Sequence, residues 1–137
     1  MSSLSAKPPN MEMTSSLTYL ALISALCIVL WLPYVFEGIL SRGLSAVLRY
    51  EESDIEPAKW AQRAHRAHLN LLENLPPFAA LVLIANLTGV TVSGAAAVFF
   101  WARIVHAIVH VAGLPYLRTV AFLVSWVAMI TMFFQVI

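Results

Sequence analysis

Four polar residues, Arg63, Arg66, Asn70 and Glu73, recur at helical spacing inside an otherwise apolar stretch. At about 100° per residue, their side chains fall within an arc of about 80° on one helix face. Arginine can bind a carboxylate through paired hydrogen bonds, and glutamate can accept an ammonium group. The stripe therefore suits a zwitterionic, peptide-like ligand. The alternative is an internal network, in which an arginine neutralises Glu73 and Asn70 bridges to a neighbouring helix.

A second polar group, Arg103, His106 and His110, falls within an arc of about 60° on a later helix. Two histidines four residues apart have the spacing of a metal-ligand pair, but the glutamate of the helical zinc motif is missing between them. We therefore expect no metal here and favour a polar contact between helices. A haem, quinone or metal site on the two histidines is a weaker alternative.

The composition decides what kind of protein must position these groups. Of 137 residues, 61% are hydrophobic and only 11% are charged, with a mean hydropathy of +0.82. A soluble domain of this size could not bury so much apolar surface. The net charge of +1 and the lack of a basic stripe argue against nucleic-acid binding. The single cysteine, Cys27, excludes a disulfide framework. These features predict an integral membrane protein.

Four apolar stretches are long enough to cross a bilayer core, which needs about 20 helical residues. They cover residues 17–40, 57–87, 92–112 and 117–137. Short connections at Thr88–Gly89 and Gly113–Pro115 require antiparallel neighbours, so we expect an all-α, up-down bundle of four transmembrane helices in one domain, 17–137. Pro76–Pro77 should kink the second helix. Residues 1–16 form a polar tail that we expect to be mobile and not a signal peptide.

Lysine and arginine gather on one side of the predicted bundle, in and around the long connection 41–56. The positive-inside rule then places this connection in the cytoplasm and both termini outside. We expect the protein to reside in a bacterial inner membrane and to contact membrane lipids.

The segment 66–78, which contains Arg66-Ala67, Asn70, Glu73 and Pro77-Phe78, resembles the signature of the MAPEG family, the membrane-associated proteins in eicosanoid and glutathione metabolism. That signature reads Arg-Ala-x-x-Asn-x-x-Glu, followed closely by Pro-Phe. The four spans and the long cytosolic connection are also similar. The resemblance implies a homotrimer of four-helix protomers that binds glutathione between neighbouring protomers.

Carried over residue by residue, the resemblance implies that Arg66, Asn70 and Glu73 hold glutathione. Further contacts are then expected from Arg42, Arg63, Arg103, His106 and His110. Arg118 resembles the arginine that stabilises the glutathione thiolate, which makes it the expected catalytic residue. His110 and Phe122 stand where many members carry aromatic hydroxyls.

The resemblance implies a membrane-bound glutathione transferase or peroxidase, with glutathione as co-substrate and no metal. Its thiolate would attack a lipophilic electrophile that arrives from the bilayer. The alternative is a non-catalytic member of the family, a lipid-binding protein or an accessory subunit of a larger membrane complex.

Overall fold

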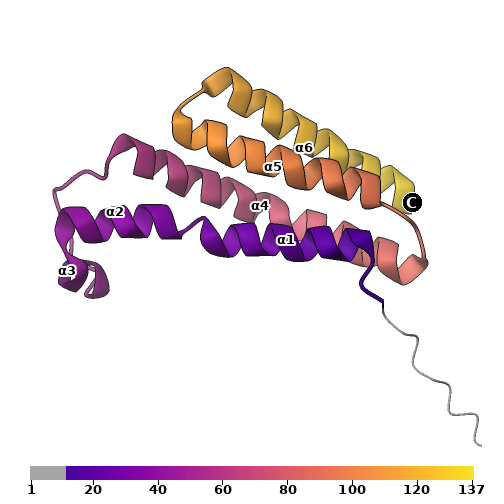
Figure 1. Ribbon diagram of the computed structural model, residues 1–137, viewed down its shortest axis with the longest axis horizontal. Helices are drawn as coiled ribbons and strands as arrows, with labels where there is room; N and C mark the ends of the chain where they lie inside the picture. The colour runs from indigo at the N-terminus through magenta and orange to yellow at the C-terminus, as the bar shows by residue number, and fades with distance from the viewer. Residues whose placement is uncertain (1–11) are drawn as a thin grey trace, which may run out of the picture.

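The computed structural model describes residues 12–137, and over this range it contains α-helices and no strand. Four helical stretches are long and apolar enough to cross a membrane, and they follow one another up and down (Figure 1). They comprise the first span Ser15–Arg42, α4 (Lys59–Thr88), α5 (Ser93–Ala112) and α6 (Pro115–Val136). The prediction of an all-α, four-helix membrane bundle is confirmed.

The first span consists of two helices, α1 (Ser15–Val29) and α2 (Leu32–Arg42), separated by a turn at 30–31. Pro33 lies in the first turn of α2 and lacks the N–H group that would bond to the carbonyl of Val29. At Pro76–Pro77, α4 continues as one helix with both prolines inside it, and the kink expected there stays a prediction.

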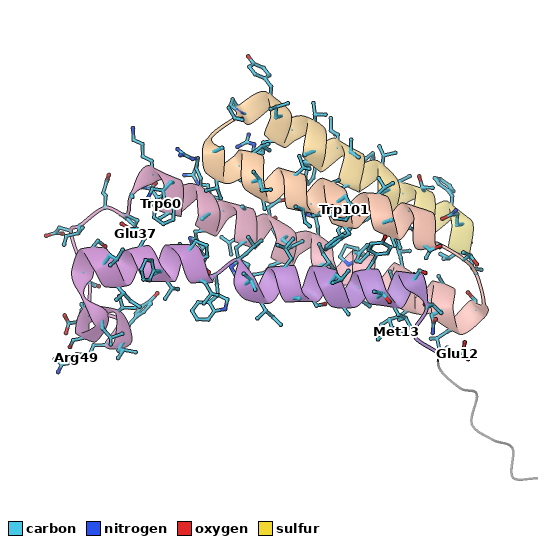
Figure 2. The ribbon with its side chains drawn as sticks, viewed as in Figure 1. Glu12, Met13, Glu37, Arg49, Trp60 and Trp101 are labelled. Atoms are coloured by element: carbon cyan, nitrogen blue, oxygen red, sulfur yellow. The ribbon has the colours of Figure 1, made fainter. Side chains whose placement is uncertain are left out.

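The connection before α4 holds a short helix, α3 (Leu44–Leu48), where the sequence predicted only a long connection. It begins after Gly43, whose φ of +86° favours glycine. The backbone N–H of Ala58, just before α4, donates to a carboxylate oxygen of Glu37 at 3.2 Å. A carboxylate at this position also interacts favourably with the positive end of the helix dipole. Figure 2 shows Glu37 where α2 approaches the start of α4.

The bundle packs around α4 and α5, which lie in the middle. α1 packs on both of them, and α6 packs mainly on α5 and also on α4. Alanines at 61, 64, 67, 85 and 96 are buried and allow the helices to approach closely. The rings of Phe78 and Phe99 stack with their centroids 4.0 Å apart. In this packing, two residues of the polar stripe of α4, Arg63 and Asn70, form hydrogen bonds with α5.

The outer faces of the bundle are apolar. Trp101 is 59% exposed and Ile108 is 64% exposed, and many leucine and valine side chains also point outward. Figure 2 shows Trp101 half-way along α5. Such a surface would be unfavourable in water and suits contact with lipid chains.

Candidate functional site

A small pocket of about 270 Å³ opens between α4, α5 and α6, and four of the predicted site residues line it. Asn70 comes from α4, His106 and His110 from α5, and Arg118 from the first turn of α6. The other lining residues are Thr119 and Phe122. The helical spacing of each group explains the arrangement, since residues four apart lie on one face.

Asn70 is held from behind by the buried guanidinium of Arg103, which is only 2% exposed. Arg103 donates from Nη1 to the Asn70 side-chain oxygen at 2.8 Å and from Nη2 to the Asn70 carbonyl at 3.1 Å. Its guanidinium also lies 5.6 Å from the ring centroids of Phe99 and Phe122. The Asn70 side-chain oxygen thus accepts from Arg103, and within residues 12–137 its NH₂ group makes no hydrogen bond, which leaves that group to donate to a ligand.

The two histidines form an edge-to-face pair, with ring centroids 5.3 Å apart. Both are buried, and within the described part of the chain Nδ1 of His110 has no hydrogen-bond partner. Over the same range, Nε of Arg103 likewise has no hydrogen-bond partner.

Arg63 is engaged at the far end of α5 and is not among the pocket-lining residues. Its Nε donates to the backbone carbonyl of Val111 at 2.9 Å. The guanidinium packs against Gly113, at the turn between α5 and α6.

Arg42, at the end of α2, and Arg66, on α4, line a second hollow of about 320 Å³ between these two helices. Tyr34, Glu37 and His65 also line this hollow. Arg42 folds back over Gly38, so that a Cβ there would lie 3.3 Å from Nη2. The structure thus places four of the predicted site residues in the first pocket and two in this hollow, whereas Arg63, Glu73 and Arg103 line neither.

Glu73 is exposed on α4 and forms no ion pair with any residue in 12–137. Over that range the one ion pair joins Arg49 to Glu51, at 3.6 Å between Nη1 and Oε1, outside the membrane spans. The internal network considered from sequence is therefore present only in part. Asn70 does bridge to a neighbouring helix, but no arginine neutralises Glu73 in the described chain.

The described residues contain no group of three or more histidine, cysteine, aspartate or glutamate side chains that could hold a metal ion.

A family model described as MAPEG family matches residues 18–137. The chain belongs to the MAPEG family. Comparison with curated proteins gives no match. Membership in the MAPEG family supports, in general terms, an integral membrane protein of the glutathione- and eicosanoid-metabolism type.

Three residues of these hollows were not predicted from the sequence: Tyr34, Glu37 and Thr119. Glu37 had a usable signal, because one ionisable residue in an apolar span needs a partner. Thr119 follows Arg118 directly, and its hydroxyl donates to the carbonyl of Pro115 at 3.0 Å. The hydroxyl of Tyr34 lies 2.9 Å from Nδ1 of His68. No sequence pattern links those two residues.

Proposed function

We propose that this protein is a membrane glutathione transferase or peroxidase that binds glutathione at the pocket between α4, α5 and α6. The observation that carries the proposal is the meeting of Asn70, His106, His110 and Arg118 in one pocket. Glutathione offers two carboxylates, an ammonium group and a thiol. A pocket with a cation and several neutral donors matches the anionic groups of that ligand.

Two charged residues that the resemblance assigns to glutathione, Arg66 and Glu73, do not line this pocket and are exposed on α4. An unpaired charge within a membrane span is costly, by about 2.5–3.5 kcal/mol at the bilayer centre. A second copy of the chain would give these two residues partners. We therefore include a homotrimer in the proposal, in which Arg42, Arg66 and Glu73 complete the glutathione site across the subunit contact.

In the proposed mechanism, the Arg118 guanidinium favours the thiolate of glutathione over the thiol. The proton leaves to water, so no general base is needed. The sulfur then attacks an electrophilic carbon of a lipophilic substrate. A carbon–sulfur bond forms, and the leaving group departs with its electron pair. The apolar outer surface would let such a substrate arrive from the bilayer.

Within the proposal, the long connection 41–56 lies in the cytoplasm and both termini lie outside. Six of the eight lysine and arginine residues lie near this connection or the α5–α6 turn, at one end of the bundle: Arg42, Arg49, Lys59, Arg63, Arg66 and Arg118. This asymmetry is what the positive-inside rule uses. The membrane proposed is a bacterial inner membrane.

The test is calorimetric titration of the detergent-purified protein with glutathione, followed by conjugation of a chlorinated nitrobenzene. We expect saturable binding, and a fall in kcat of about 100-fold or more in Arg118→Ala, since it loses the charge that stabilises the anion. Arg49→Ala is the matched control, because Arg49 is exposed outside the spans and pairs only with Glu51. Wild-type protein without heat or thermal stabilisation at millimolar glutathione would refute the proposal.

One observation favours a second candidate, a non-catalytic lipid-binding or accessory subunit. Phe122 presents an apolar ring to the pocket, and the Thr119 hydroxyl beside it is already bonded to the helix backbone. Few donors are therefore left to hold a thiolate. Glutathione binding without turnover would support this candidate.

A further inference from the structure

Arg63 contacts the turn that joins α5 to α6. Its Nε donates to the carbonyl of Val111 at 2.9 Å, one residue before α5 ends at Ala112. Gly113 follows with a φ of +79°, and a Cβ placed there would lie 3.2 Å from Cζ of Arg63. The guanidinium therefore packs directly on the turn, in space that only a glycine leaves free.

Arg63 supplies a hydrogen bond that the backbone of the turn does not supply. Two of the last α5 carbonyls, those of Val109 and His110, accept backbone N–H groups from Leu114 and Gly113 at 3.0 Å each. The carbonyl of Val111 accepts Arg63 instead. A cation near the carboxyl end of a helix is also favoured by the helix dipole. Arg63 thus completes the cap of α5 and ties that cap to α4.

Two pocket residues flank this turn. His110 lies three residues before Gly113, and Arg118 lies five residues after it, with its N–H bonded to the carbonyl of Leu114 at 3.0 Å. Asn70, on the opposite wall, is carried by the same helix as Arg63. The contact of Arg63 with the turn therefore holds the wall formed by His110 and Arg118 in place relative to Asn70 on α4.

We infer that Arg63 is a positioning residue that sets Arg118 and His110 against Asn70, and that it does not itself touch glutathione. This inference rests on the proposed function. It differs from the direct glutathione contact that the sequence resemblance implied for Arg63.

The structural half of the inference is tested by thermal unfolding in detergent. Gly113→Asn adds a Cβ that presses on the guanidinium, whereas asparagine tolerates the left-handed backbone better than other side chains do. Gly89→Asn is the matched control, since Gly89 has a φ of +72° and open space around a built Cβ. We expect Gly113→Asn to lower Tm more than Gly89→Asn does. The excess should vanish when Arg63→Ala is also present.

The functional half compares glutathione with S-methylglutathione, which has no thiol to ionise. In Arg63→Gln we expect the Kd of S-methylglutathione to change less than about threefold, because the charged groups of the ligand keep their partners. The kcat for conjugation should fall about 10- to 100-fold, because a displacement of Arg118 by about 1 Å misplaces the sulfur. Arg63→Lys should recover only part of this loss, since lysine lacks the planar fork.

A rise of tenfold or more in both Kd values, with kcat unchanged, would overturn the inference and make Arg63 a direct contact. Equal effects of Arg63→Ala in the Gly113→Asn and Gly89→Asn backgrounds would overturn it too. If the wild-type protein binds neither ligand, the proposed function is wrong, and the role of Arg63 in catalysis is lost with it. The unfolding cycle still decides whether Arg63 holds the turn.

Discussion

Replacing Asn70 by aspartate should stabilise the protein and weaken glutathione binding at the same time. The Asn70 side-chain oxygen accepts from Arg103 at 2.8 Å, and the structure gives this buried guanidinium no carboxylate partner within residues 12–137. Asn70→Asp keeps the shape of the side chain and supplies that negative charge. The NH₂ group assigned to the ligand disappears in the same step.

The two effects differ in size. A hydrogen bond to a charged group contributes about 1.5–3 kcal/mol, and an ionised acceptor strengthens it further. We expect a gain of roughly 1 kcal/mol in the free energy of unfolding, or about 3–5 °C in Tm. Loss of the donor to a ligand carboxylate removes about 1.5–3 kcal/mol of binding, a factor of about 10 to 150 in Kd.

Thermal unfolding in detergent and calorimetric titration with glutathione measure the two effects. Asn86→Asp is the control, since Asn86 also lies on α4 and its side-chain oxygen accepts from the Thr14 hydroxyl at 3.3 Å. A destabilisation as large as that of Asn70→Ala would show that Arg103 does not hold the Asn70 oxygen. An unchanged Kd would show that the Asn70 amide does not donate to glutathione.

Three further changes test other parts of the structure. Glu37→Gln should lower Tm by a few degrees, because an ionised acceptor at the start of α4 is worth about 1 kcal/mol, and thermal unfolding measures it. Gly38→Ala should raise the Kd of glutathione by up to about tenfold by displacing the Arg42 guanidinium, whereas Gly94→Ala, with nothing near a built Cβ, should leave it unchanged in the same titration. Cys27, 8% exposed, should react with a maleimide far more slowly in mild detergent than after denaturation, and equal rates would contradict its burial.

The membrane itself made the fold predictable. Helices must satisfy their own backbone hydrogen bonds in lipid, so long apolar runs could be assigned to spans with little ambiguity. The turn at 30–31 was missed because Pro33 lies within a continuous apolar run, where nothing else marks an interruption. The short α3 was missed because five residues carry no clear periodicity.

Periodicity could group the polar residues but could not pair them. It placed Asn70 in the stripe of α4 and Arg103 in that of α5, and in the structure the α5 group lies together, whereas Arg66 and Glu73 lie apart from Asn70. Which arginine meets Asn70 depends on how far α5 is rotated and shifted against α4, and that follows from packing such as the stack of Phe78 on Phe99. The sequence alone therefore could not show that Arg103 bonds to Asn70 or that Arg63 reaches across to Val111.

The turn at 30–31 separates two ways of packing within the first span. The apolar half, α1, packs on both α4 and α5, whereas α2 packs mainly on α3 and α4. Two polar contacts join α2 to the α4 region, one between the Tyr34 hydroxyl and Nδ1 of His68 and one from the Ala58 N–H to Glu37. The charged end of the first span is therefore placed by hydrogen bonds to α4 and its start, and its apolar end by burial.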